Sequence, residues 1–322
     1  MATKPRVIAP DKYYQISSVG NTNFHILGTD SLKLFFLSLL AAYLKKYQLS
    51  CISWSLLDNH YHLIIKTGSD PALSLFMQSL NSVFAKHYNK TNKTFGSVFA
   101  KRFSSIIVQE GNNLKEIIRN VHLNPVRSGD CTLENINSYK WCGHAEIVND
   151  KDNSIIDRAA LLNLFGSDDN QLSKYKTYIA TPCEGIPDSV KMMQLSNRGT
   201  LDFHKSNFLV IGDAAFAKEV FAQDLVRKAK VARYVKENIV LDHITKKVSI
   251  GIQFTADSIR MRGRLNEQST FRQLFALYAH CYYDFRCTQI AEYLKVTPSA
   301  VSMMISRCNR ITDLEIIKEF IG

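Results

Sequence analysis

Long apolar runs and paired cysteines are missing from this sequence of 322 residues. The apolar stretch from Leu34 to Leu44 is too short to span a bilayer, and Lys33 and Lys45 bound it. The N-terminal segment MATKPRVIAPDKYY has no apolar centre of the kind that a signal peptide needs. We therefore expect no membrane role, and we interpret the apolar stretch as an amphipathic packing helix.

The sequence also has no closely spaced pair of cysteines, and it has fewer acidic than basic residues. The seven cysteines are scattered and odd in number, and none forms a C-x-x-C pair, so we expect reduced thiols in a cytoplasmic protein. Asp and Glu number 29 against 40 Lys and Arg, which leaves a net charge of +11. This excess favours a polyanionic partner, mainly nucleic acid. Hydrophobic residues at 46% and charged residues at 21% exclude wholesale disorder, collagen and coiled-coil architectures.

Residue patterns predict an α+β sandwich in the first half of the chain. Alternation predicts strands over 12–19, 51–57 and 61–66, and helical periodicity predicts helices over 31–48, 72–88 and 114–122. We expect a polar, basic loop over 89–94 and a short apolar and basic run over 95–108. Strands and helices mixed in this order are typical of α+β domains.

The polar segment 148–154 predicts a domain boundary. The chain is accordingly divided into a nucleic-acid-binding domain over 1–148, a helical connector over 149–212, and a helical domain over 213–322. Further helices are expected over 158–165, 172–179 and 213–238, with a linker over 181–187.

The string NHYHLII at 59–65 carries the first candidate metal ligands. Side chains alternate along a strand, so His60 and His62 would point to the same face. Two neutral imidazoles placed in this way can bind one divalent cation. Short motifs of this kind also occur without a ligand, so paired histidines that hold no metal are the alternative.

The string RNVHLNPVR at 119–127 carries the second set of candidates. Glu116, Asn120 and Asn124 are four residues apart, so they share a helical face opposite an apolar stripe. The alternatives are a solvent-facing stripe, or Asn124 as a helix stop before Pro125.

Together these strings resemble the single-tyrosine HUH transposases, and among them the REP-associated tyrosine transposases. The resemblance covers residues 8 to 147, and it also includes FGSVFAKRF at 95–103 and Trp141. It implies a ferredoxin-like α+β sandwich in which two histidines and a polar residue on a helix hold Mg²⁺ or Mn²⁺. By position these ligands would be His60, His62 and Asn124.

The nucleophile of that family is a tyrosine four residues before the third ligand, and this sequence has Asn120 there. A carboxamide cannot attack a phosphate to form a phosphotyrosyl intermediate. The resemblance therefore implies a cradle for metal and DNA without the cleaving group. Three explanations are open: Tyr88 or Tyr139 substitutes as nucleophile, a metal-bound water acts instead, or the domain binds without cleaving. Binding alone is the simplest explanation.

Basic and aromatic residues interleave between 86 and 103, which suits single-stranded or hairpin nucleic acid. Lys101 and Arg102 match the basic pair of the family, and we expect them to contact phosphates together with Arg127. We interpret the phenylalanines of this run as a core stripe because they are four residues apart. They are Phe95, Phe99 and Phe103.

The segment 288–307 has the pattern of a helix-turn-helix. Thr297 followed by Pro298 is a strong start for its second helix. The residues expected to face duplex DNA are Ser299, Ala300, Ser302, Met303, Ser306 and Arg307. A helical hairpin that binds nothing is the alternative.

The sequence thus predicts a domesticated transposase that acts as a regulator. It would bind single-stranded or hairpin DNA through its first domain and duplex DNA through its last. RNA hairpins are open as ligands, and a homodimer is an open alternative. The rival functions are an active metal-dependent single-strand endonuclease or transposase, and a protein-interaction module without affinity for nucleic acid.

Overall fold

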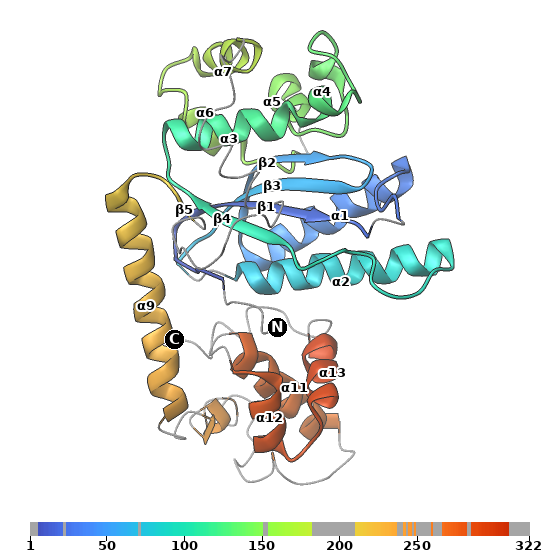
Figure 1. Ribbon diagram of the computed structural model, residues 1–322, viewed down its shortest axis with the longest axis vertical. Helices are drawn as coiled ribbons and strands as arrows, with labels where there is room; N and C mark the ends of the chain where they lie inside the picture. The colour runs from blue at the N-terminus through green and yellow to red at the C-terminus, as the bar shows by residue number, and fades with distance from the viewer. Residues whose placement is uncertain are drawn as a thin grey trace. The chain divides into compact units, whose positions relative to one another are not determined.

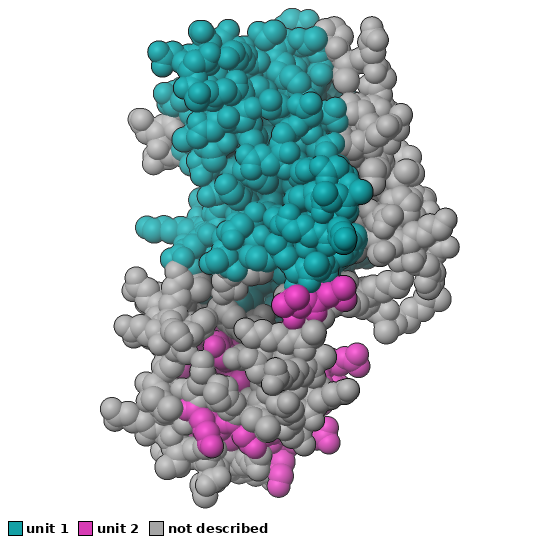
Figure 2. Space-filling view, turned by 90° about the vertical axis from the view of Figure 1, so that its left-hand side faces the viewer, with its two compact units in different colours: residues 1–223 teal, residues 224–322 magenta. Residues whose placement is uncertain are grey.

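The computed structural model of the chain describes residues 6–21, 24–69, 72–150, 154–181, 210–236, 266–281 and 285–308, with a few positions between 241 and 259. The chain forms two compact units, residues 1–223 and residues 224–322, which Figure 2 shows in different colours. The linker predicted over 181–187 lies almost entirely outside the described residues. The three-part division of the chain stays a prediction.

The first unit is built on a five-stranded sheet with the strand order β2-β3-β1-β4-β5 (Figure 1). The strands are β1 (Tyr13–Val19), β2 (Ser50–Leu56), β3 (His60–Lys66), β4 (Ser104–Val108) and β5 (Val210–Ile211). The first four strands pair in antiparallel fashion, and β5 joins β4 in parallel. The order of the first four strands is that of a ferredoxin-like sandwich, so the predicted α+β fold is confirmed.

Helices cover both faces of this sheet. The helices of the first unit up to residue 181 are α1 (Asp30–Tyr47), α2 (Leu73–Asn92), α3 (Asn112–His122), α4 (Asn124–Ser128), α5 (His144–Asn149), α6 (Arg158–Asn163) and α7 (Gln171–Ala180). Figure 1 shows α1 and α2 on one face and α3 on the other. The next described helix, α9 (Ala214–Lys236), follows β5.

Strand alternation places the two candidate histidines on the α3 face of the sheet. Tyr61 of β3 lies against Phe36 of α1, with ring centroids 4.6 Å apart, and its hydroxyl donates a 2.6 Å hydrogen bond to Asn81 of α2. Because neighbouring side chains in a strand point to opposite faces, His60 and His62 face away from α1 and α2.

Helix α2 is longer than predicted, and it includes residues that we expected to form a loop. No proline or glycine interrupts residues 89–92, so the helix continues through Asn92. It ends where Lys93 adopts a left-handed conformation, with φ of 53°.

Helices α3 and α4 are almost continuous. Leu123 separates them, and its amide still donates to the carbonyl of Arg119 at 2.9 Å. Helix α3 ends at His122 as predicted, and Pro125 lies in the first turn of α4, where a missing amide hydrogen costs nothing. The predicted polar stripe of Glu116, Asn120 and Asn124 therefore crosses this joint.

Helix α7 is held to the first unit by a buried polar cluster, here called the Tyr175 cluster, of Tyr175, His122, His144 and Asn137. The Tyr175 hydroxyl lies 2.9 Å from His122 Nδ1 and 2.6 Å from His144 Nδ1. His144 Nε2 lies 2.9 Å from Asn137 Oδ1. If His144 donates to Asn137, its Nδ1 accepts from Tyr175, whose oxygen accepts from His122. The cluster therefore joins α3, α5 and α7 with one consistent set of donors and acceptors.

The second unit contains α11 (Asn266–Cys281), α12 (Cys287–Leu294) and α13 (Pro298–Cys308). The amide of Ala300 donates to Thr297 Oγ1 at 3.2 Å, so Thr297 caps α13 as expected. The buried residues between α12 and α13 include Ile290, Leu294 and Val301. None of the helices in the described ranges combines the length and the apolar character that a membrane span requires.

Candidate functional site

His60 and His62 lie next to each other at the start of β3, both half-buried. Their ring centroids are 5.3 Å apart, and the rings are nearly perpendicular at 86°. His60 Nε2 lies 3.4 Å from Asn124 Nδ2, and His62 Nδ1 lies 3.2 Å from Nε2 of Gln15 in β1. The structure therefore brings the three predicted ligands, His60, His62 and Asn124, to one place.

Burial keeps both imidazoles neutral. Burial, followed by the nearby His60 and Arg127, lowers the pKa of His62 to about 3. Burial also lowers the pKa of His60, although the Asp130 carboxylate partly opposes this. Each ring therefore keeps a nitrogen lone pair at pH 7, which is the state that a metal ligand requires.

Asn120 lies at the end of α3 beside two cationic side chains. It is buried, with 8% of its surface exposed, and the Arg127 guanidinium donates to its backbone carbonyl. Burial lowers the pKa of Arg127, and Arg119 lowers it further, so both guanidinium groups share this end of the helix. Guanidinium groups can contact phosphate oxygens through paired hydrogen bonds.

The donor set around His60 fits a divalent cation only in part. Two imidazole nitrogens and one amide oxygen carry no charge, whereas Mg²⁺ and Mn²⁺ favour charged oxygens. Arg127 repels a cation, and Asp130 is the carboxylate that acts on His60. Among the described residues, no three His, Cys, Asp or Glu side chains lie close enough to hold a metal ion. A cation at these residues would therefore need the negative charge of a bound phosphate.

Gln15 affects which nitrogen of His62 is available. Its Nε2 lies near His62 Nδ1 and donates to the Ile16 carbonyl at 3.2 Å, while its buried Oε1 has no hydrogen-bond partner among the described residues. If the Gln15 side-chain amide is turned over, Gln15 Oε1 accepts a hydrogen bond from His62 Nδ1. The lone pair on His62 Nε2 is then free to bind a cation.

The two tyrosines considered as substitutes for the nucleophile are poorly suited to that role. Tyr88 is buried in α2, where its ring lies 5.6 Å from the ring of Phe24. Burial raises the pKa of Tyr139 well above its ordinary value, and Asp130 raises it further, so its phenolate is difficult to form.

Lys101 and Arg102 are exposed on the loop before β4, as expected of phosphate-contacting residues. Arg6 lies near them: burial lowers its pKa to about 10, and Arg102 adds to this effect. The Arg6 guanidinium lies 3.6 Å from the centre of the Phe103 ring. This loop therefore presents a group of cations next to an aromatic ring.

The predicted core stripe of phenylalanines is wrong for Phe95, which is 93% exposed. Phe99 is half-buried, and the centroids of the Phe99 and Phe84 rings are 6.2 Å apart. A spacing of four residues brings side chains together only in a helix, and these residues lie in a loop in which Gly96 has φ of 91°.

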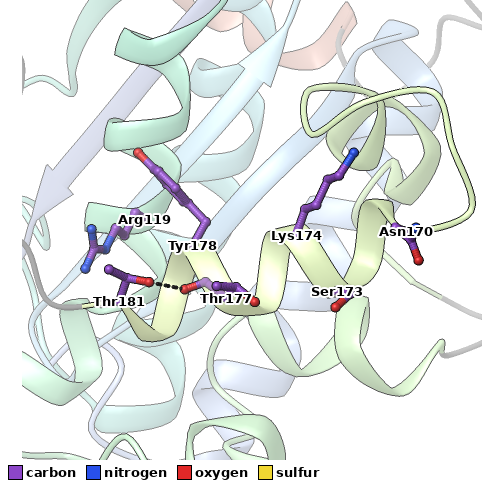
Figure 3. Close-up of a pocket in the computed structure, with 7 residues that line it drawn as sticks. All are labelled: Arg119, Asn170, Ser173, Lys174, Thr177, Tyr178 and Thr181. Carbon is purple, nitrogen blue, oxygen red and sulfur yellow. Dashed lines mark hydrogen bonds between the residues drawn. The ribbon is translucent and has the colours of Figure 1, made fainter.

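A shallow groove of about 430 Å³ runs along α7 beside the end of α3 (Figure 3). Its lining residues are Arg119, Asn170, Ser173, Lys174, Thr177, Tyr178 and Thr181. The Arg119 guanidinium lies 5.5 Å from the centre of the Tyr178 ring, and Lys174 pairs with Asp168 at 2.8 Å. Sequence reasoning missed this groove because its residues come from two helices about fifty positions apart and carry no motif.

The residues of α13 that were expected to face duplex DNA differ in exposure, and the helix-turn-helix stays a prediction. Ser299, Ser302, Met303 and Arg307 are exposed, and Ala300 and Ser306 are half-buried. Lys295 to Thr297 join α12 to α13.

Comparison with known proteins finds one family model that matches the first part of the chain. Residues 10–122 match the family model described as IS200-like transposase, a range that includes His60, His62 and Asn120 and ends just before Asn124. No curated protein matches the chain.

Two solved structures resemble the chain weakly. One is a REP-associated tyrosine transposase bound to a REP hairpin, with 12% identity and a TM-score of 0.40 over 46% of this chain and 86% of that chain. The other is a candidate transposase from Deinococcus radiodurans R1, with 13% identity and a TM-score of 0.27 over 34% of this chain and 88% of that chain. The family match itself covers strands β1 to β4 and the histidine pair, so residues 10–122 of this chain are similar to the IS200-like transposases.

Proposed function

We propose that this protein is a domesticated transposase that binds nucleic acid and has lost tyrosine-dependent strand cleavage. Its first unit would bind single-stranded or hairpin DNA, with RNA hairpins as an open alternative. The observation that carries the proposal is that His60, His62, Asn124 and Arg127 lie close together beside Asn120, the residue at the position where the resemblance expects the nucleophile.

The electrostatics of the cradle support a phosphate ligand. Arg119 and Arg127 supply positive charge, and the two neutral histidines supply hydrogen-bonding nitrogens. A bound Mg²⁺ or Mn²⁺ would polarise the phosphate, and it would be held by His60, His62 and Asn124. Because this donor set is uncharged, we expect metal binding to depend on the presence of nucleic acid.

Helices α12 and α13 would bind duplex DNA as a helix-turn-helix. The exposed Ser299, Ser302 and Met303 would face base edges, and Arg307 would contact a phosphate. A protein that combines these two modes of binding is suited to regulate genes or processes that involve single-stranded DNA.

The test is incubation of the full chain with a labelled pool of genomic single strands that contain hairpins, in the presence of Mn²⁺. Native gels report binding, and denaturing gels report cleavage and covalent adducts. The variants are His60→Ala and, as a matched histidine control, His87→Ala, whose ring stacks on Phe35 in the helix layer.

Shifted but intact DNA is the expected result. Cleavage that His60→Ala abolishes and His87→Ala retains would overturn the proposal and establish the metal-dependent endonuclease. A covalent adduct would point to a displaced tyrosine. Absence of any salt-dependent shift would leave a protein-interaction module.

A further inference from the structure

The tip of the loop between α2 and β4 holds an aromatic side chain out in solvent. Phe95 is 93% exposed, and no other large apolar side chain described between residues 86 and 103 is exposed. Exposing a phenylalanine ring to water is unfavourable, since burying one typically gains about 1.5–3 kcal/mol. An isolated ring in this position is therefore a candidate contact residue.

Hydrogen bonds hold this loop in one conformation. Asn89 Nδ2 donates to the carbonyl of Gly96 at 3.1 Å, and the Thr94 hydroxyl donates to Asn89 Oδ1 at 2.9 Å. The Ser97 hydroxyl donates to the Phe99 carbonyl at 2.6 Å. Phe95 is thus presented between fixed neighbours, and little conformational freedom of the loop would be lost when its ring binds a partner.

The loop is joined to the histidine end of the sheet. The amide of Ala100 donates to the Val19 carbonyl at 3.1 Å, and Val19 pairs with His60 in the register of β1 and β3. A strand bound at His60 would therefore leave the cradle close to the segment that carries Phe95.

The charged side chains in the segment around Phe95 are all basic. Between Asp70 and Glu110 the sequence has no acidic residue. It has five basic residues there, Lys86, Lys90, Lys93, Lys101 and Arg102, all of them exposed. Positive charge on both sides of one exposed ring complements a polyanion that carries flat, apolar bases.

We propose that Phe95 stacks on an unpaired base of a nucleic-acid strand, while the flanking lysines contact the phosphates on either side of that base. The inference rests on the proposed nucleic-acid binding and assigns it a base-stacking contact. A protein partner fits less well, because one ring among five cations offers far less apolar area than a protein interface buries.

The test measures fluorescence anisotropy of a labelled DNA hairpin with random-sequence single-stranded flanks, titrated with the full chain. Phe95→Ala should weaken binding about 5- to 150-fold, the range that corresponds to loss of one base-stacking contact. Phe95→Trp should bind at least as well as the wild type, and its indole fluorescence should be quenched by the bound strand. Leu34→Ala is the matched control, because Leu34 is an apolar residue of α1 that is 60% exposed.

A second probe separates stacking from backbone contacts. On a DNA whose single-stranded flanks carry abasic sugars only, wild type and Phe95→Ala should bind equally. Equal binding on intact DNA, or an equal loss on both DNAs, would overturn the stacking contact while leaving the proposed function intact. If the wild type binds neither DNA, both fail. If Phe95→Ala instead reduces self-association in sedimentation without changing DNA affinity, a second copy of the chain covers the ring, and the inference is wrong.

Discussion

Asn120 and its neighbours define what the cradle can and cannot do. Strand alternation predicted that His60 and His62 share one face, and the family resemblance, not the spacing, added Asn124 as the expected third ligand. The sequence could not show that Arg127 reaches back to the Asn120 carbonyl, because this contact depends on the joint at Leu123. The exposure of Phe95 was also missed, because a four-residue spacing has no meaning outside a helix.

Arg127→Ala should weaken binding of single-stranded DNA and reduce the salt dependence of the affinity. Loss of one phosphate contact lowers the slope of log affinity against log salt by about 0.7 for a single strand. The measurement is a salt titration of the binding constant. Lys45→Ala, at the exposed end of α1, should leave the slope unchanged. An unchanged slope for Arg127→Ala would remove Arg127 from the phosphate contacts.

Stability should fall in mild acid because His144 is held neutral. Its pKa is lowered to about 4 by burial and then by Lys176, while His122 and Tyr175 pack against it from α3 and α7. The unfolded state therefore binds a proton more readily, so the contribution is complete above about pH 6.5 and is lost as the pH falls towards 4. Denaturant unfolding across this range should show a smaller slope with pH for His144→Gln than for the wild type. An unchanged slope would contradict the prediction.

Helices α6 and α7 were predicted from periodicity, but their attachment was not. The Tyr175 cluster links residues 122, 137, 144 and 175, and no motif in the sequence marks such a set. Strands β1 to β3 and helices α1 to α3, in contrast, follow from local patterns, because strand alternation and helical periodicity are visible in the sequence. Long-range hydrogen bonds of single side chains leave no comparable local trace.

Tyr175→Phe should destabilise the first unit by about 1–3 kcal/mol, the usual cost of leaving buried polar groups unsatisfied. The hydroxyl is the shared partner of His122 and His144, so its loss affects both rings. Thermal or denaturant unfolding gives the value, with Tyr43→Phe on α1 as the control. A change below about 0.5 kcal/mol would mean that the cluster contributes little.

The proposed function assigns a separate binding activity to each of the two units. Ser302→Glu places a negative charge on the exposed face of α13, where repulsion by phosphates should weaken duplex binding about tenfold or more. Binding of single-stranded DNA by the first unit should not change. Parallel gel-shift titrations with duplex and single-stranded DNA test this. Equal loss on both substrates would show that the two activities are not separable.

The short parallel strand β5 also has a consequence for synthesis of the chain. It covers the edge of β4, and Gln109 donates to Asp213 at 2.8 Å across a sequence separation of 104 residues. At about 5–20 residues per second, a ribosome needs about 5 to 20 seconds to deliver this closing strand after β4 has left the exit tunnel. During that interval the edge of β4 is open to strands of neighbouring nascent chains. The yield of folded protein should therefore depend on how fast this middle segment is translated.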